Sequence, residues 1–222
     1  IDSAPPTGRN PEDLHRRAEE SPFRITDPNR EAELVRLVDD VKQAGDSLGG
    51  TFQVAVTGVP AGLGSHIQHH TRLDGRLAQA MMSIQAIKGV EIGIGFAAAR
   101  RRGSTVHDPI GWKPGRGFGR ESNRAGGIEG GMSNGEDILL TAAMKPIPTL
   151  YQPLASVDMI SKEPFAAGIE RSDVCAVPAA AVVGEAAAAW EIAAALLEKF
   201  GGDHLDEIRR AVETYRADLA TF

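Results

Sequence analysis

A glycine-rich segment at residues 122–135 constrains the fold of this chain more than any other feature. It reads Ser-Asn-Arg-Ala-Gly-Gly-Ile-Glu-Gly-Gly-Met-Ser-Asn-Gly, and half of its last ten residues are glycine. Glycine loses the most backbone entropy on ordering, so the segment is unsuited to the interior of a helix or strand. With no Cβ in the way, its backbone N–H groups can lie close against a phosphorylated or planar ligand. A flexible loop is the alternative interpretation.

Three other segments accompany this run along the chain. They are Met82-Ser-Ile-Gln-Ala-Ile-Lys-Gly-Val-Glu-Ile-Gly93, Ala143-Met-Lys-Pro-Ile-Pro-Thr149 and Arg171-Ser-Asp-Val-Cys-Ala-Val-Pro178. In this order, the four segments resemble the chorismate synthase family, whose members catalyse the flavin-dependent last step of the shikimate pathway. The shorter motifs at 45–50, 60–64 and 73–77 fit the same family, so the resemblance extends over residues 30 to 210.

One departure from the family pattern is large. In the family, about half of the chain precedes the position of Gly45, and that half carries a Gly-Glu-Ser-His-Gly opening and further histidines and arginines of the site. This chain contains no such half and begins at Ile1 without an initiator methionine. We therefore interpret it as the C-terminal portion of a chorismate synthase, with residues 1–29 as an irregular lead-in and 30–222 as part of a single domain.

Lys145 stands at the end of a predicted strand and is followed by Pro-Ile-Pro-Thr149. The prolines fix the backbone direction, and a positioned lysine with a threonine hydroxyl suits a phosphate group. A simple surface lysine is the alternative. The resemblance implies that flavin mononucleotide (FMN), in its reduced form, is bound by these residues: Gln85, Ala86, Gly130, Lys145, Pro146, Ile147, Pro148, Thr149 and Arg171.

Arg171 and Asp173 precede an apolar helix, where an ion pair between them is one interpretation. The resemblance places Arg171 at the flavin and substrate, and Asp173 beside the reactive part of the flavin. A carboxylate there can accept a proton or tune proton release, so we assign Asp173 as catalytic.

The implied reaction is the 1,4-elimination of phosphate from 5-enolpyruvylshikimate 3-phosphate, which yields chorismate. The enzyme would be a carbon–oxygen lyase acting on phosphate and, as in the family, a homotetramer. Some members also reduce flavin with NADPH, but no segment here marks a nicotinamide site. The alternative is an inactive C-terminal fragment that acts only as a flavin-binding, structural or oligomerisation module.

Composition excludes several other classes of protein. The net charge of −6 argues against nucleic-acid binding, although Arg100–Arg102, Arg116, Arg120 and Arg124 form either a solvated turn or an anion pocket. The single cysteine, Cys175, excludes a disulfide framework, fits a cytoplasmic location and suits a small buried position. The polar N-terminus shows no signal peptide. Glu185 and Glu191 argue against a membrane span at 176–197.

His66, His69 and His70 lack a carboxylate partner at metal-ligand spacing, so we expect a surface loop and no metal site. Hydrophobic periodicity predicts helices over 28–44, 72–87, 178–200 and from 203 onward, and strands over 51–57, 89–93 and 137–145, with a loop over 103–125. This order lacks regular βαβ alternation and favours an α+β fold of mixed helices and antiparallel sheet. The resemblance implies a β-α-β sandwich, incomplete without the N-terminal half.

Overall fold

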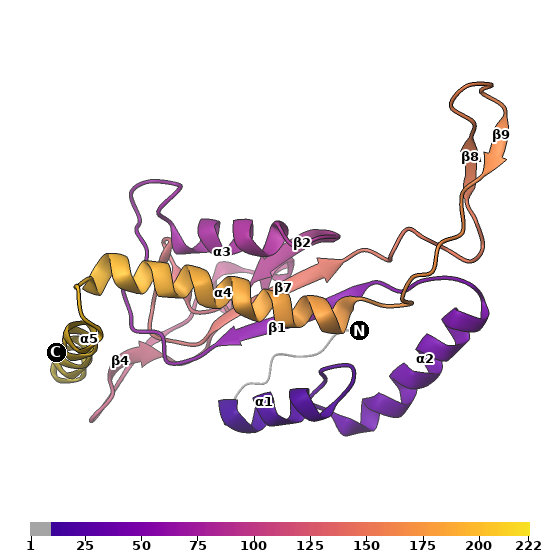
Figure 1. Cartoon of the computed structure of the whole chain (residues 1–222). Helices are drawn as coiled ribbons and strands as arrows, with labels where there is room; N and C mark the ends of the chain where they lie inside the picture. The colour runs from indigo at the N-terminus through magenta and orange to yellow at the C-terminus, as the bar shows by residue number, and fades with distance from the viewer. Residues whose placement is uncertain (1–9) are drawn as a thin grey trace. The chain divides into compact units, whose positions relative to one another are not determined.

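The computed structural model describes residues 10–222 and has an α+β architecture (Figure 1). Its helices are α1 (Pro11–Glu20), α2 (Glu31–Gln43), α3 (Leu73–Met82), α4 (Val177–Phe200) and α5 (Leu205–Thr221), with 3₁₀ turns at Pro28–Arg30, Gly95–Arg100 and Gly103–Thr105. Its strands are β1 (Gly50–Val56), β2 (Ile87–Ile92), β3 (Ile110–Lys113), β4 (Gly117–Arg120), β5 (Ile128–Glu129), β6 (Met132–Ser133), β7 (Ile138–Met144), β8 (Ala155–Val157) and β9 (Pro164–Ala166).

The main sheet has three strands in the order β1-β7-β2. The central strand, β7, is also the most apolar, and its Ile138, Leu140 and Ala142 are fully buried. Each of the other strand pairs, β3–β4, β5–β6 and β8–β9, is an antiparallel hairpin.

The described chain divides into two compact units. The first comprises residues up to 52, 86–88 and 143–182, and the second comprises 53–85, 89–142 and 183–222. Each unit is therefore assembled from segments that lie far apart in the sequence.

The core of the second unit includes one face of α3, as its periodicity predicts. Leu73, Leu77 and Met81 recur at a spacing of four residues and have no exposed surface. The helix is shorter than the predicted 72–87. It ends at Met82, and the hydroxyl of the following residue, Ser83, donates to the Gln79 carbonyl at 2.7 Å. Ala86 then adopts a φ of 65°, which is incompatible with a continuing right-handed helix.

The lead-in at 1–29 is not irregular throughout, and residues 1–9 of it lie outside the described part. Helix α1 begins where the Asn10 side chain accepts a hydrogen bond from the Glu12 backbone N–H at 3.0 Å. Pro11 follows at the first helical position, and Glu12 and Asp13 complement the helix dipole. We weighted the prolines as breakers and missed that Pro11 can begin a helix.

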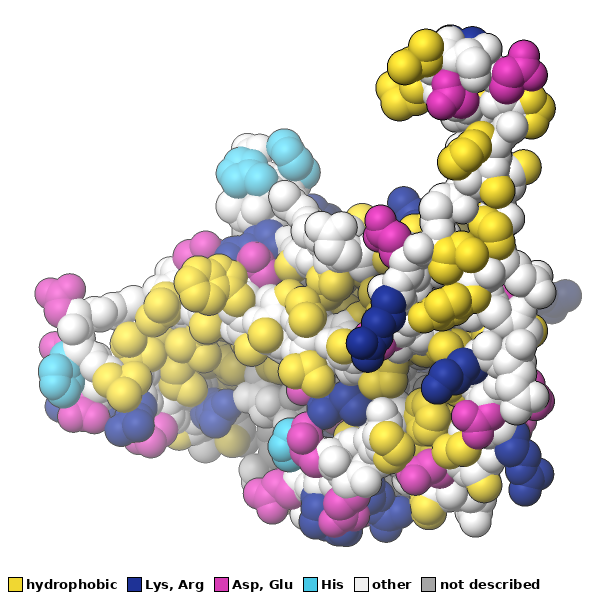
Figure 2. All heavy atoms as spheres, turned by 45° about the vertical axis from the view of Figure 1, so that its right-hand side comes forward, with side chains coloured by type: hydrophobic (Ala, Val, Ile, Leu, Met, Phe, Trp, Pro, Cys, Tyr) yellow, Lys and Arg dark blue, Asp and Glu magenta, His cyan; other side chains and the backbone are white. Residues whose placement is uncertain are grey.

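The predicted loop at 103–125 is also wrong in part, because it contains the β3–β4 hairpin. The segment at 150–176, for which we predicted no element, contains the β8–β9 hairpin. Its apolar side chains are largely exposed, with Met159 at 85% and Ile160 at 93%. Figure 2 shows hydrophobic side chains next to charged ones on this hairpin.

Helix α4 matches the predicted 178–200 closely and is long and apolar enough to cross a membrane by length and composition alone. One side of the helix packs within the second unit. Ala188 and Ala195 are buried, and Glu191 forms an ion pair at 2.9 Å with Arg76 of α3. Only 28% of its apolar window is buried, however, so much of the helix surface has no cover in the described chain.

Candidate functional site

The proline-containing segment after β7 is held to three other parts of the first unit. The Lys145 backbone N–H donates to the Ala86 carbonyl at 2.9 Å. The Ser47 hydroxyl donates to the Ile147 carbonyl at 2.6 Å, and the Ser172 hydroxyl donates to the Thr149 carbonyl at 3.0 Å. Because prolines 146 and 148 supply no backbone N–H, the segment makes the last two of these links through its carbonyl groups.

The segments at 47–49 and 171–175 lie side by side next to it. Leu48 forms a parallel bridge with Cys175, and its N–H donates to the Val174 carbonyl at 2.7 Å. A Cβ at Gly49 would meet the Met144 carbonyl oxygen at 2.4 Å, so only glycine permits this approach to the end of β7. Cys175 is half-buried rather than buried as expected.

The first unit therefore brings together Ala86, Lys145–Thr149, Arg171 and Asp173, which lie up to 87 positions apart in sequence. Gln85 is the chain neighbour of Ala86 and belongs to the second unit, as does Gly130. Ala86 has a left-handed φ of 65°, a conformation that costs a non-glycine residue about 1–3 kcal/mol. Such strain is typical of functional positions.

The charged side chains of the predicted site residues in the first unit have no ion-pair partners within the described residues. Lys145, Arg171 and Asp173 are all exposed, and among residues 10–222 none of them forms an ion pair. The ion pair between Arg171 and Asp173 that we considered is therefore not formed. Two cations without ion-pair partners among residues 10–222 suit the phosphate of a cofactor, because charge-assisted hydrogen bonds to phosphate are strong.

In the second unit, the glycine-rich segment forms the β5–β6 hairpin. Its two-residue turn consists of Gly130 at φ 60° and Gly131 at φ 88°, which is the pattern of a type I′ turn. A Cβ at Gly131 would meet the Ser65 carbonyl oxygen at 2.7 Å, whereas a Cβ at Gly130 would meet nothing within 4 Å. The Gly131 side of the turn is packed, and the Gly130 side is open to a ligand.

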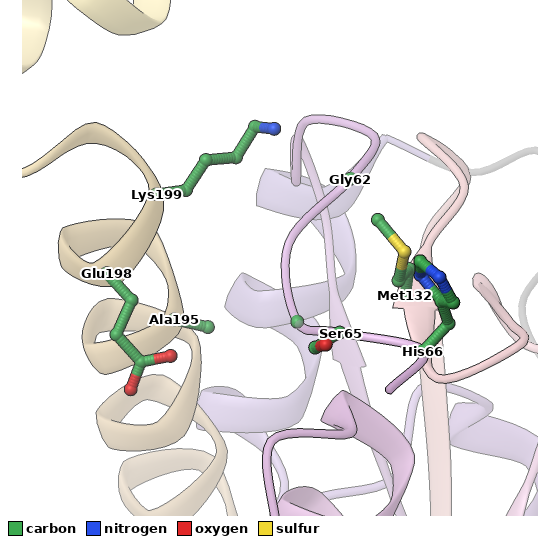
Figure 3. A pocket seen from close by; sticks show the side chains of 8 residues that line it. Gly62, Ser65, His66, Met132, Ala195, Glu198 and Lys199 are labelled. Atoms are coloured by element: carbon green, nitrogen blue, oxygen red, sulfur yellow. The ribbon is translucent and has the colours of Figure 1, made fainter. Parts of the chain in front are cut away.

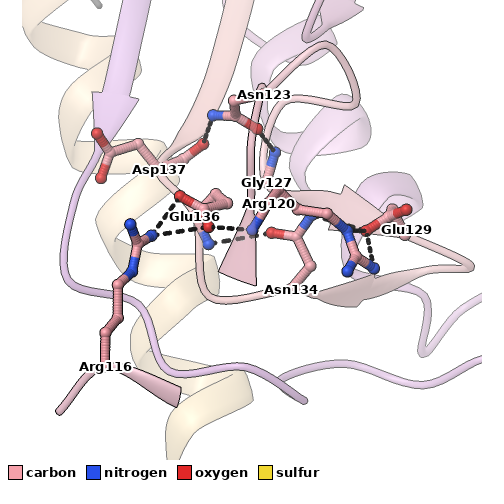
Figure 4. A network of polar contacts seen from close by, with 8 residues as sticks. All are labelled: Arg116, Arg120, Asn123, Gly127, Glu129, Asn134, Glu136 and Asp137. Atoms are coloured by element: carbon pink, nitrogen blue, oxygen red, sulfur yellow. Dashed lines mark hydrogen bonds and ion pairs between the residues drawn. The ribbon is translucent and has the colours of Figure 1, made fainter. Parts of the chain in front are cut away.

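Side chains fix this hairpin from both strands, as Figure 4 shows. The Glu129 carboxylate accepts from Arg120 Nε at 2.7 Å and from Asn134 Nδ2 at 2.9 Å. Asn123 donates to the Asp137 carbonyl and accepts from the Gly127 N–H, both at 2.8 Å. The segment therefore forms a hairpin whose backbone and side chains are bonded to polar groups around it, and not a loop without regular structure.

Carboxylates near this hairpin contact three of the arginines that we considered as an anion pocket. Arg116 donates to Glu136 at 2.8 Å, and Arg120 pairs with Glu129 at 2.7 Å. Arg124 lies 3.7 Å from Asp108. Beside Glu136, burial raises the pKa of Asp137; the Glu136 charge raises it further, and the Arg116 charge opposes both. These three arginines therefore have carboxylate neighbours in place of an anionic ligand.

The histidines behave as a surface loop, as predicted. His66, His69 and His70 are exposed, and no group of three or more metal-ligating side chains occurs in the part of the chain that the structure describes. His66 lines a cavity of about 340 Å³ in the second unit (Figure 3), together with Gly62, Gly64, Ser65, Met132, Ala195, Glu198 and Lys199. Lys145–Thr149 and Arg171 do not line it, so this cavity is separate from the cofactor residues that we predicted.

Some residues that organise these segments were missed at the sequence level. Ser47 lies inside a motif at 45–50 that we had noted, so its hydroxyl could have been considered. Ser172 lies between two residues that we selected. Asp108 lies outside every motif, and only the fold shows that its buried carboxylate contacts the glycine-rich segment.

Comparison with known proteins gives a consistent result. The family model described as "Chorismate synthase" matches residues 7–197. The chorismate synthase of Desulforamulus reducens is 60% identical over 205 residues, which are 92% of this chain and 53% of that protein. The chorismate synthase of Aquifex aeolicus is 56% identical, over 96% of this chain and 54% of that protein.

A solved structure described as "Crystal Structure of Chorismate Synthase" has a TM-score of 0.81 and 50% sequence identity, and the match covers 96% of this chain and 57% of that one. The chain thus spans about half the length of the relatives that it matches. With a family model over most of its length and a solved relative of the same fold, the chain belongs to the chorismate synthase family.

Proposed function

We propose that this chain supplies a large part of the flavin pocket of a chorismate synthase. The whole enzyme would convert 5-enolpyruvylshikimate 3-phosphate to chorismate and phosphate by 1,4-elimination, as a lyase of aromatic amino-acid biosynthesis. The observation that carries the proposal is a pair of cations, Lys145 and Arg171, that have no ion-pair partner among residues 10–222. They lie on segments that are joined through Ser47, Ser172 and Leu48.

The residues of this chain have distinct roles in the proposal. Lys145 and Arg171 bind the phosphate of the cofactor, and the segment Pro146–Thr149 sets their direction. Gln85, Ala86 and Gly130 offer backbone and small side chains against the cofactor, and Asp173 holds or moves a proton beside it. Reduced FMN, when bound, supplies an electron-rich ring that stabilises charge while the C–O bond to phosphate breaks.

The fit between these residues and a flavin phosphate rests on charge and space. Both cations are exposed and lack carboxylate partners in the described chain, and Gly130 leaves the space beside it empty.

A cytoplasmic location and a homotetramer belong to the same proposal, which includes no NADPH site. Nucleic acid and membrane are not among the proposed partners, and the negative charge of the chain supports the former point.

The second candidate is a module without activity of its own that binds flavin or serves oligomerisation. For either candidate, the matched part of the relatives is 53–54% of their length. The two candidates differ in turnover. We expect no measurable chorismate from the isolated chain with reduced FMN, because the resemblance places the acid–base histidines in the other half. Phosphate release by the purified chain, free of any full-length enzyme, would contradict this expectation.

A hybrid enzyme tests the proposal itself. This chain replaces the matching 54% of the Aquifex aeolicus chorismate synthase, and FMN affinity and chorismate formation are measured. We expect both to be retained, because the chain carries the proposed flavin residues. A folded hybrid that does not bind FMN would show that the flavin assignment is wrong.

A further inference from the structure

Asp108 is an aspartate without exposed surface on its side chain. It lies between the Gly103–Thr105 turn and β3, and no motif of the sequence includes it. Aspartate is rarely fully buried unless its charge is compensated. Here its carboxylate accepts hydrogen bonds from the Ser122 hydroxyl and from the backbone N–H groups of Arg124 and Ala125, at 2.9 Å and 2.8 Å for the latter two.

These contacts keep the group ionised. Burial raises the pKa of Asp108, but the hydrogen bonds from Ser122, Ala125 and Arg124, together with the Arg124 charge, outweigh it and hold the pKa below its ordinary value. The carboxylate is therefore an anion at neutral pH, and all its donors lie within residues 122–125. These are the first four residues of the glycine-rich segment.

Directly after these residues, the backbone of the glycine-rich segment crosses the backbone that follows β2. A Cβ at Gly126 would meet the Gly93 nitrogen at 2.2 Å, and a Cβ at Gly93 would meet the Arg124 carbonyl oxygen at 2.1 Å. The Ile94 N–H donates to the same Arg124 carbonyl at 2.9 Å. Asp108 thus fixes the residues that cross the end of β2, and a shift at 124 or 125 would be transmitted to Gly126 and Gly127.

The far end of the segment is anchored independently. The Leu73 N–H donates to the Gly131 carbonyl at 2.8 Å, and the Ser133 hydroxyl donates to the Pro60 carbonyl at 2.6 Å. The β5–β6 hairpin lies between this anchor and Asp108. The open turn residue Gly130 can keep one position only if both ends are fixed.

We infer that Asp108 is a positioning residue for the flavin site: its buried carboxylate fixes residues 122–125 so that the Gly130 turn presents its open side to the cofactor. This inference rests on the proposed function, because it concerns the flavin contact at Gly130. It adds a residue that has no contact of its own with the cofactor.

Asp108→Asn tests this in the hybrid enzyme. The asparagine keeps the size of the side chain but replaces one accepting oxygen with an NH₂ group, so a buried donor at 122–125 loses its partner. Asp158→Asn is the matched control, because Asp158 organises the exposed β8–β9 loop through the Ile160 and Ser161 N–H groups. Amide hydrogen exchange, FMN titration and the absorption spectrum of bound FMN are measured well below the melting temperature of each variant.

We expect Asp108→Asn to speed exchange over residues 122–135, to weaken FMN binding about tenfold and to change the spectrum of bound FMN. Asp158→Asn should speed exchange only near 159–163 and leave FMN affinity unchanged. If Asp108→Asn lowers the melting temperature while FMN affinity and spectrum stay as in the unmodified hybrid, Asp108 only stabilises the fold and the inference is overturned. Unchanged exchange over 122–135 overturns it as well. Failure of the unmodified hybrid to bind FMN is a separate result, which contradicts the proposed function before any variant is compared.

Discussion

At the scale of single residues, the proposed site is defined by charges that the described chain leaves unpaired. Lys145 follows directly after β7, and its N–H is bonded to the Ala86 carbonyl, so its backbone is fixed while its side chain is exposed. A cation with a fixed backbone and without a carboxylate neighbour in the described chain is available to an anionic ligand.

Lys145→Glu should therefore weaken FMN binding in the hybrid enzyme by at least about tenfold, since a charge-assisted hydrogen bond is lost and replaced by repulsion. Fluorescence titration of FMN measures this. Lys113→Glu makes the same charge change on an exposed strand residue of β3 and should leave the affinity unchanged. Equal FMN affinity in Lys145→Glu and the unmodified hybrid would rule out the role of Lys145.

Asp173→Asn distinguishes catalysis from scaffolding. The variant keeps the side-chain size but removes the charge and the ability to take up a proton, so turnover of the hybrid should fall on the order of a hundredfold. FMN affinity and melting temperature should hardly change, because Asp173 is exposed and forms no ion pair within residues 10–222. Asp39→Asn, on the exposed side of α2, is the control. A loss of stability with unchanged turnover per folded molecule would assign Asp173 to scaffolding.

The sequence allowed the residues of this site to be selected, but not the way they are held. Lys145 and Arg171 stand out because each lies in a segment that resembles the family, at 143–149 and 171–178. The contacts of Ser47 with the Ile147 carbonyl and of Ser172 with the Thr149 carbonyl join positions that are up to 100 residues apart. Such long-range pairings leave no local pattern, and the same holds for Asp108.

At the scale of elements, hydrophobic patterns predicted most of the longer helices and strands. α2, β1, β2, β7, α4 and α5 all agree with the prediction within a few residues. The β3–β4 hairpin was missed because its strands contain glycine and expose Ile110, Trp112 and Phe118. A strand that buries neither face regularly shows no alternation that could be detected.

The β3–β4 hairpin offers a test with an internal control. Gly115 and Gly117 have similar left-handed φ values, 77° and 75°. A Cβ at Gly115 would meet nothing within 4 Å, whereas a Cβ at Gly117 would meet the Leu219 carbonyl oxygen of α5 at 2.5 Å. Alanine at either position introduces the backbone strain, but only alanine at Gly117 also displaces α5.

Gly115→Ala should lower the free energy of unfolding by about 1–2 kcal/mol through the left-handed backbone. Gly117→Ala should lower it by about 1–3 kcal/mol more, because of overpacking against α5. Urea denaturation of both variants measures the difference. If the two variants are equally stable, β4 does not contact α5 in solution.

At the scale of the whole molecule, α4 has more apolar surface than the described chain covers. Val183, Trp190 and Leu197 recur every seven residues and are 52%, 75% and 51% exposed. Ala186 and Ala193 lie between them on the same side, which gives the spacing of a helix–helix contact. Figure 2 shows apolar side chains gathered along this helix. The described chain leaves this side of α4 without cover.

Exposed apolar surface of this kind drives association. We therefore predict that the isolated chain is not a well-behaved monomer: light scattering at micromolar concentration should show a dimer, a larger species or aggregation. Trp190→Glu should shift the distribution toward monomer, because it puts a charge in the middle of the exposed side of α4. Ile67→Glu, at a residue that is 72% exposed but lies in a loop, should not shift it.

A sharp monomer of 23.5 kDa with a cooperative melt would mean that α4 needs no neighbour beyond its own chain. A Trp190→Glu variant that associates as strongly as the unmodified chain would place the contact elsewhere, and the exposed β8–β9 hairpin would then be the next surface to test.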